Sequence, residues 1–108
     1  MASAYKVLGQ VNPAATTNTT LYTVPSSTST VCSTLSICNL GVSTTYRVAV
    51  RPAGEAIANK HFLAYDASVQ QNDTAFLTLG ITLATTDVIT VYAGTANVSF
   101  SLFGTELT

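Results

Sequence analysis

The chain consists of short segments rich in β-branched and aromatic residues, and turn-forming residues separate these segments from one end to the other. No window of about 11 residues keeps the apolar period of an amphipathic helix, whereas apolar and polar side chains alternate in several segments. Only Glu55–Lys60 has the composition of a helical turn. The sequence therefore predicts strands at Tyr5–Val11, Thr19–Val24, Thr30–Leu40, Thr45–Arg51, His61–Val69, Thr74–Leu79, Asp87–Ala93 and Val98–Phe103.

Strands of this number and length predict an all-β fold: a single antiparallel β-sandwich of about eight short strands, with immunoglobulin-like or jelly-roll connectivity. The chain has 108 residues. Because domains usually contain roughly 100–150 residues, we expect one domain that covers residues 1–108.

Alternation within the strands predicts which side chains face the core, because neighbours in a strand point to opposite sides. The expected inward residues are Tyr46, Val48, Val50, Val98, Phe100 and Leu102, with a less regular set at Val31, Ser33, Leu35 and Ile37. Core aromatic residues are expected at Tyr5, Tyr46, Phe62, Tyr65, Phe76 and Phe100. Tyr22 and Phe103 fall on the other side of their alternation, so we expect a partner protein to cover them.

Charged side chains are scarce, with 4 basic and 5 acidic residues against 29 Ser and Thr. Soluble domains usually carry about 25% charged residues, and this chain carries 8%. A hydroxyl-rich surface can be covered by another protein without leaving buried charges unpaired. Two open sheets would also leave edge strands that few charges protect. The composition therefore predicts a subunit of an assembly.

The same composition argues against several other classes of protein. A net charge of -1 gives no excess positive charge for phosphate groups, so we expect no nucleic acid partner. No apolar run approaches the ~18 residues of a membrane span, so we expect no membrane partner. No signal peptide is recognised, so the chain is expected to stay in the cytosol. The sequons at Asn18, Asn72 and Asn97 are then products of the Thr-rich composition.

Residues with catalytic or metal-binding chemistry are few and scattered. His61 is the single histidine, and strand alternation sends Asp66 to the opposite face, so no catalytic triad is indicated. Cys32 and Cys38 would lie roughly 20 Å apart in one strand, beyond the reach of a disulfide. We therefore expect no enzyme, no metal and no cofactor. The isolated carboxylates are Glu55, Asp66, Asp73, Asp87 and Glu106.

Arg47 and Arg51 are half of the basic residues and lie on the outward side of one predicted strand, with Ala49 between them. Two interpretations stay open. The arginines form a patch that aids solubility, or they bind a carboxylate or carbonyl groups of a neighbouring subunit. Together with Tyr22 and Phe103 they are the candidate protein–protein interface residues.

Four stretches carry a resemblance to a known class of proteins. They are AATTNTTLYTVP at 14–25, YRVAVRP at 46–52, DVITVYA at 87–93 and VSFSLFG at 98–104. Over nearly its whole length the chain resembles small β-sandwich virion proteins of tailed bacteriophages, especially those of cyanobacteria and other aquatic hosts. The resemblance implies a non-enzymatic structural protein of the virion and carries no catalytic residues.

Within that class, we expect a capsid decoration or cement protein that binds across major capsid subunits. The alternative is a tail, neck or baseplate component. The expected partners are the major capsid protein or other virion proteins and further copies of the chain, as a dimer or trimer, assembled in the host cytoplasm. No fibre repeat or collagen-like stretch is present. The hypothesis from another class is a carbohydrate-binding module with Tyr22, Tyr92 or Phe103 as the sugar platform.

Overall fold

The computed structural model describes residues 2–108, which form eight strands and two single-turn 3-10 helices. The helices η1 (Pro52–Gly54) and η2 (Asn59–His61) lie between β4 and β5, in place of the helical turn expected at Glu55–Lys60. Within the described residues no helix is long and apolar enough to cross a membrane. The strands are β1 (Ser3–Val11), β2 (Thr19–Thr23), β3 (Ser29–Asn39), β4 (Thr44–Arg51), β5 (Phe62–Val69), β6 (Thr74–Leu83), β7 (Val88–Ala93) and β8 (Val98–Leu107).

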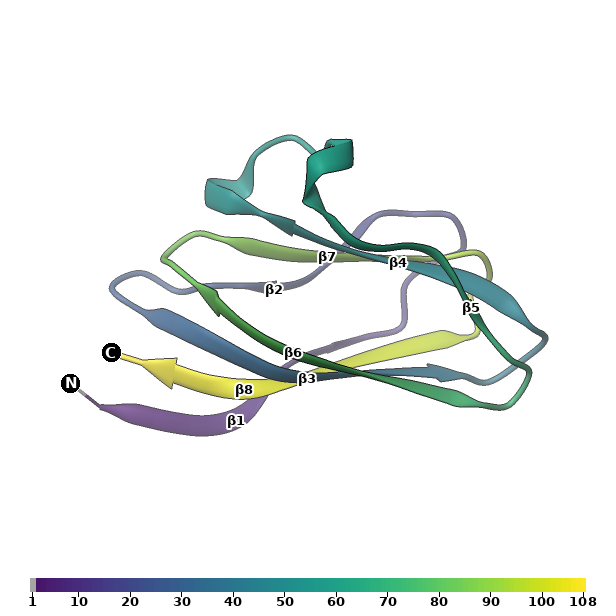
Figure 1. Cartoon of the computed structure of the whole chain (residues 1–108), viewed down its shortest axis with the longest axis horizontal. Helices are drawn as coiled ribbons and strands as arrows, with labels where there is room; N and C mark the ends of the chain where they lie inside the picture. The colour runs from purple at the N-terminus through teal and green to yellow at the C-terminus, as the bar shows by residue number, and fades with distance from the viewer. Residues whose placement is uncertain (1) are drawn as a thin grey trace.

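The strands form two four-stranded sheets that pack face to face, so the predicted antiparallel β-sandwich is confirmed (Figure 1). The first sheet has the order β1-β8-β3-β6 and the second the order β2-β7-β4-β5. Strand β1 pairs with β8, β2 with β7, β3 with β6 and β4 with β5. This is the pairing of one long antiparallel ribbon rolled into a sandwich, which is the jelly-roll arrangement.

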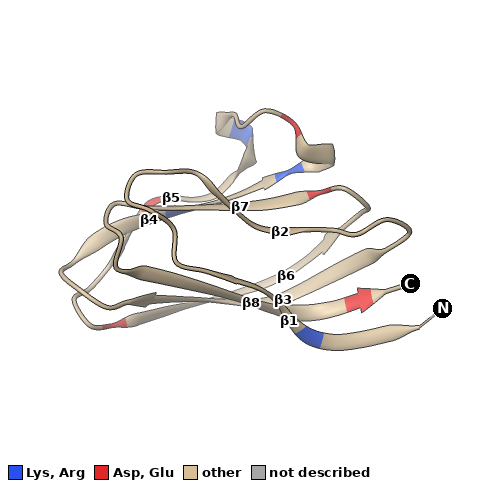
Figure 2. Ribbon diagram, turned by 180° about the vertical axis from the view of Figure 1, so that it is seen from behind, with Lys and Arg blue, Asp and Glu red and all other residues tan. Residues whose placement is uncertain are grey.

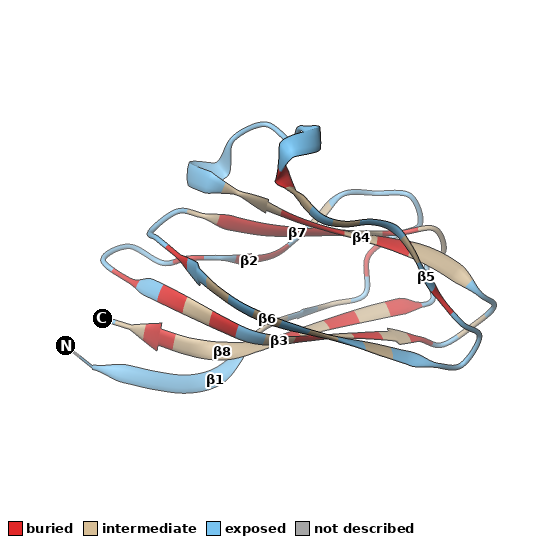
Figure 3. Cartoon of the chain, viewed as in Figure 1, coloured by how far each residue is buried: buried red, intermediate tan, exposed pale blue. Residues whose placement is uncertain are grey.

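The core lies between the two sheets, as the buried segments in Figure 3 show. The inward residues predicted for β4 and β8 are confirmed as buried at Tyr46, Val48, Val98, Phe100 and Leu102. Val50 is half-buried and packs against the same core. The rings of Tyr46 and Phe100 meet edge to face with centroids 6.5 Å apart, which adds about 0.5–1.5 kcal/mol to the stabilisation from buried area.

A bulge in β3 changes which of its residues face the core. The residues on either side of Ser33 pair with consecutive residues of β8, so Ser33 has no partner there. After the bulge, Leu35 and Ile37 are buried as predicted. Before it, Cys32 is buried and Val31 lies on the outer side. The expectation that Val31 and Ser33 face the core is therefore wrong, because an extra residue in one strand reverses its alternation.

The edge strands β1 and β6, which flank β8 and β3, are irregular beside the bulge of β3. In β1 the register shifts between Val7 and Gly9, and in β6 Gly80 adopts a φ of 60° opposite the bulge of β3. Glycine adopts this left-handed conformation without the steric penalty of a side chain. Strand β8, by contrast, keeps one alternation from Val98 to Glu106, since Val98, Glu106 and the alternate residues Phe100 and Leu102 are all buried.

Three aromatic residues expected in the core lie at the surface instead. Tyr5, Phe76 and Tyr65 are 85%, 68% and 57% exposed. The shift at Leu8 reverses the alternation of β1, and in β6 the neighbours of Phe76 are the residues that pack against the core. Tyr22, expected outside, is buried. These corrections leave two large aromatic side chains on the outer face of the first sheet.

Gly104 in β8 lies against the bulge of β3. A Cβ atom at this position would meet the carbonyl oxygen of Val31 and lie 3.1 Å from the Cα atom of Cys32. Both are backbone atoms, so they cannot move aside as the end of a flexible side chain can.

We predict that Gly104→Ala lowers the free energy of unfolding by about 1–3 kcal/mol, because the new methyl group displaces the backbone of β3. Urea denaturation followed by circular dichroism measures this loss. Thr78→Ala, at an exposed position of the same sheet, is the control and should change stability by no more than about 0.5 kcal/mol. Equal stability of the Gly104→Ala variant and the parent chain would contradict the close approach of Gly104 to the backbone of β3.

Candidate functional site

The outer face of the first sheet carries no Lys, Arg, Asp or Glu side chain within residues 2–108. Lys6 on β1 and Glu106 on β8 are the charged residues within its strands (Figure 2). The register partners of both residues belong to the side of the sheet that faces the core, so Lys6 and Glu106 lie on that side too. We call this outer surface the hydroxyl face, because most of its side chains are Ser or Thr. Its residues are Ser3, Tyr5, Val7, Gln10, Ser29, Val31, Thr34, Ser36, Cys38, Thr74, Phe76, Thr78, Thr82, Ser99, Ser101, Phe103, Thr105 and Leu107.

The apolar side chains of the hydroxyl face are arranged as one projection and one hollow. Phe76 projects from β6, opposite Ser36 of β3. A shallow hollow of about 570 Å³ lies over β1 and β8, and its lining includes Tyr5, Val7 and Phe103. Phe103, a candidate interface residue, is half-buried at this surface. The face therefore offers an uncharged area with relief suited to contact with another protein.

Arg47 lies on the outer face of the second sheet and is held within its own chain. Its Nε atom donates to Asp66 Oδ1 at 2.6 Å and its Nη2 atom to Oδ2 at 3.3 Å. The guanidinium carbon lies 4.2 Å from the ring centre of Tyr65 and 4.1 Å from that of Tyr92. The hydrogen bond with Asp66 raises the pKa of Arg47 above its usual range. The carboxylate expected from a neighbouring subunit is thus supplied by the same molecule.

A bulge in β5 produces this arrangement. Two residues of β5, Tyr65 and Asp66, oppose Arg47 alone in β4. Asp66 adopts a φ of 52°, a left-handed conformation that Asp tolerates better than most residues. The extra residue directs a ring and a carboxylate at one guanidinium group, which no alternation rule predicts.

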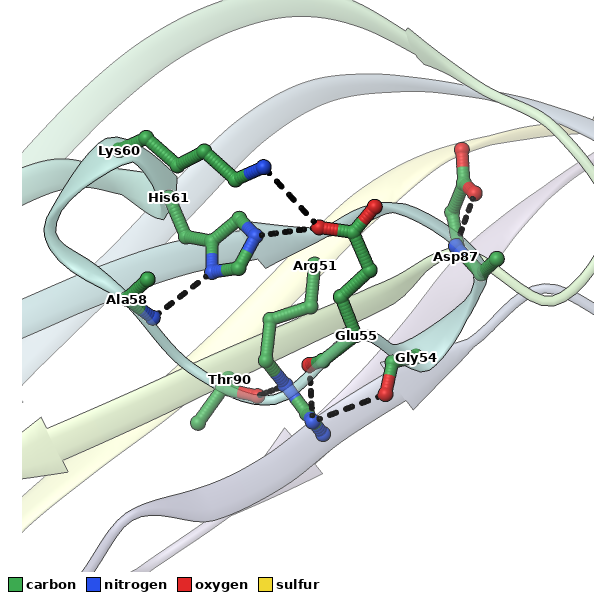
Figure 4. A network of polar contacts seen from close by, with 9 residues as sticks. Arg51, Gly54, Glu55, Ala58, Lys60, His61, Asp87 and Thr90 are labelled. Atoms are coloured by element: carbon green, nitrogen blue, oxygen red, sulfur yellow. Dashed lines mark hydrogen bonds and ion pairs between the residues drawn. The ribbon is translucent and has the colours of Figure 1, made fainter.

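Arg51 binds the segment that follows β4 (Figure 4). Its Nε atom donates to Thr90 Oγ1 at 3.0 Å, and its Nη1 atom donates to the carbonyl oxygens of Glu55 at 2.8 Å and Gly54 at 3.4 Å. On the other side of the turn, the backbone N–H of Ala53 donates to an Asp87 carboxylate oxygen at 2.9 Å. Arg51 therefore fixes the loop of its own chain over the second sheet.

His61 is buried in the same loop and both of its ring nitrogens are engaged. The backbone N–H of Ala58 donates to Nδ1 at 3.0 Å, so the neutral ring carries its proton on Nε2, which donates to Glu55 Oε1 at 3.2 Å. Lys60 Nζ lies 3.4 Å from the same carboxylate oxygen. These contacts, the hydrogen bond from His61 first, lower the pKa of Glu55. The six-residue separation of Glu55 and His61 spans an irregular loop, so sequence spacing gave no signal of their contact.

Tyr22 belongs to a buried polar network between the sheets. Its hydroxyl donates to Glu106 Oε2 at 2.5 Å and lies 2.8 Å from Thr30 Oγ1. Lys6 Nζ lies 2.6 Å from Glu106 Oε1, and this contact, followed by that of Tyr22, lowers the pKa of Glu106. The network joins β1, β2, β3 and β8. Tyr22 is 7% exposed, so its expected role at an interface or sugar platform is wrong.

This network predicts a dependence of stability on alkaline pH. Burial, followed by the hydrogen bond to Glu106, raises the pKa of Tyr22 from 10.0 to about 12. A raised pKa in the folded state means that the stabilisation is complete below pH 10 and is lost as the pH rises towards 12.

We therefore expect Tyr22→Phe to be less stable than the parent chain at pH 8, because Glu106 loses a buried donor. The difference should shrink between pH 10 and 12, since only the parent chain must keep a buried tyrosine protonated. Urea denaturation across this range measures the effect. Tyr5→Phe, at an exposed tyrosine, is the matched control. A Tyr22→Phe difference that stays constant with pH would contradict the prediction.

The remaining chemical groups form no reactive cluster among the described residues. No group of three or more His, Cys, Asp or Glu side chains there lies close enough together to hold a metal ion. Cys32 and Cys38 are free, and burial raises the pKa of the Cys32 thiol to about 11. Comparison with models of protein families, with curated proteins and with solved structures finds no match.

Proposed function

We propose that this protein is a non-enzymatic structural subunit of a phage particle, a capsid decoration protein that stabilises the head by binding across major capsid subunits. It would be assembled into the virion in the host cytoplasm. The observation that carries the proposal is the hydroxyl face, an entire sheet surface without a charged side chain. Covering such a surface leaves no charge desolvated and unpaired, which would cost several kcal/mol for each buried ion.

The placement of the charged side chains supports the same proposal. Arg47 is occupied by Asp66, Arg51 by backbone carbonyls, and Lys6 by Glu106. These charged groups stabilise the subunit itself and do not form a charged patch for recruiting a ligand. The jelly-roll fold also recurs in viral capsid domains, although a fold alone does not specify a function.

The buried histidine supports a non-enzymatic role. A general base needs a free nitrogen within reach of the group that it deprotonates. Both nitrogens of His61 already have partners, and the Glu55 carboxylate is paired with His61 and Lys60. The arrangement explains the loop conformation without any catalytic role.

We predict that phage heads assembled without this protein form but burst at a lower temperature, because a subunit that binds only the assembled shell stabilises it in proportion to occupancy. Heat survival of particles, with and without added purified protein, measures the effect. Thr78→Lys, which places a charge on the hydroxyl face, should restore survival poorly. Thr17→Lys, in an exposed loop away from that face, should restore it fully. Equal survival with and without the protein would refute the cement function.

A tail, neck or baseplate position is the alternative within the same particle. Copy number separates the two, since hundreds of copies per virion indicate the capsid or a tail tube, and a dozen or fewer indicate the neck or baseplate. Quantitative mass spectrometry of purified virions gives this number.

Carbohydrate binding is a second candidate function, favoured by one hollow on the second sheet. Its lining includes Asn59, Phe62 and Tyr65, and the two rings meet edge to face at 4.8 Å. The Tyr65 ring is 57% exposed, although Arg47 lies over one of its faces, and a partly exposed ring beside an amide group is suited to a sugar ring. A glycan-array screen should then show binding by the parent chain and none by Tyr65→Ala. Absence of binding by the parent chain would remove this candidate.

A further inference from the structure

We propose that the hydroxyl face is the contact between two copies of this chain, with Phe76 of each copy seated in the hollow of the other. This inference deepens the proposed function, since it names the partner of the face whose lack of charge carries that function. In this arrangement the second copy covers the hydroxyl face, and the dimer would bind the capsid through the outer faces of its second sheets, where Arg47 and Asp66 pair with each other.

Phe76 is the projecting part of the contact. Its side chain is 68% exposed, and it cannot turn inward because Ala75 and Leu77 on either side pack against the core. Phe76 lies on the edge strand β6 of this uncharged face. An aromatic side chain held in water gains most from burial in an apolar recess.

The hollow is a recess of matching character on the same face. Tyr5, Val7 and Phe103 line it beside the bulge residue Ser33. Lys6 also borders the hollow, with its ammonium group bound to Glu106 at 2.6 Å. Within one molecule Phe76 cannot reach it, because β6 and β8 are separated by β3. Only a second molecule can bring the projection and the hollow together.

The positions of projection and hollow are compatible with two-fold symmetry. Phe76 aligns with Ser36 and, through it, with Ser101 of β8, while the hollow lies at Phe103 and Gly104. They are therefore about 10 Å apart across the strands and about 10 Å apart along them. A two-fold axis lying in the face, midway between them, exchanges the two sites and makes two identical contacts.

This geometry also fixes how the two sheets cross. The line from Phe76 to the hollow has roughly equal components across and along the strands. The two-fold axis crosses the midpoint of this line at a right angle and therefore makes about 45° with the strands. The strands of the two copies then cross at about 90°. Orthogonal crossing is one of the two preferred arrangements of packed sheets. Four strands give a face about 19 Å wide, so two faces that cross at right angles overlap over roughly 400 Å² per partner. This is the size of a weak interface, in which the two seated Phe76 rings supply most of the binding energy.

The absence of charge favours a second copy over a partner of opposite charge. A two-fold contact places a surface against itself, so any charged side chain near the axis would face its own copy. The hydroxyl face has none, whereas the outer face of the second sheet carries Arg47 and Asp66. The face that can pair with itself without repulsion is therefore the hydroxyl face.

Sedimentation equilibrium over a range of concentrations tests the proposal. The parent chain should be a dimer, and Phe76→Ser should raise the dimer Kd by about 100-fold, since each dimer loses two buried rings. Leu63→Ser, at an exposed apolar residue outside the hydroxyl face, is the matched control and should remain a dimer. Circular dichroism verifies that each variant is folded. A monomeric parent chain, or a Phe76→Ser variant that dimerises equally well, would overturn the proposal.

A second experiment tests the contact itself. In a Cys38→Ser background, the double variant Thr74→Cys with Val7→Cys keeps Phe76 in place and should form disulfide-linked dimers, because residue 74 lies beside the seated ring and meets residue 7 of the other copy. The single variants should not, and residues 74 and 7 of one chain are too far apart to bridge, being on the two edges of the sheet. Equal crosslinking of the single and double variants would overturn the proposed geometry.

The outcomes distinguish this inference from the proposed function. Dimers that fail to bind phage heads would refute the decoration function and leave the dimer standing. A monomeric chain that binds heads, and loses that binding with Phe76→Ser, would show that the capsid covers the hydroxyl face and would overturn the dimer.

Discussion

The structure depends on the alternation of β8, which neighbouring strands accommodate by bulging. Val98, Phe100 and Leu102 place alternate apolar side chains in the core, and the same alternation continues to Glu106. Strands β1 and β3 each insert one extra residue beside it. Because a bulge reverses the alternation of its own strand, these insertions decide which side chains form the core and which form the outer face. The exposure of Tyr5 follows directly from this constraint.

A second constraint is the small number of charged side chains in this protein. The ion pairs and charge-assisted hydrogen bonds join parts of one molecule: Lys6 with Glu106, Arg47 with Asp66, and Arg51 with backbone carbonyls. The few charged side chains thereby stabilise the interior, the loop over β4 and the bulge of β5. One whole face of the molecule is left to hydroxyl and aromatic groups, and both proposals rest on that division.

Local patterns in the sequence were sufficient to predict the eight strands, because strand formation depends on short alternating segments and turn residues. They could not decide between immunoglobulin-like and jelly-roll connectivity, since the pairing of β1 with β8 joins the two ends of the chain. They placed Tyr22 and Tyr5 on the wrong sides of their strands, because a bulge such as the one at Leu8 cannot be recognised from the alternation of apolar and polar residues. The contact of His61 with Glu55 depends on an irregular loop and was equally hidden.

The jelly-roll pairing of the strands has a consequence for the order in which they pair during folding. The β4 and β5 pair closes the shortest loop, and each further pair outward from it encloses a longer stretch of chain. Closing a longer loop costs more entropy unless the inner pairs already hold its ends together. We therefore expect β1 to pair with β8 last. Until it does, Tyr5 of β1 cannot complete the recess on the outer sheet, so the proposed dimer would form only from chains that have finished folding.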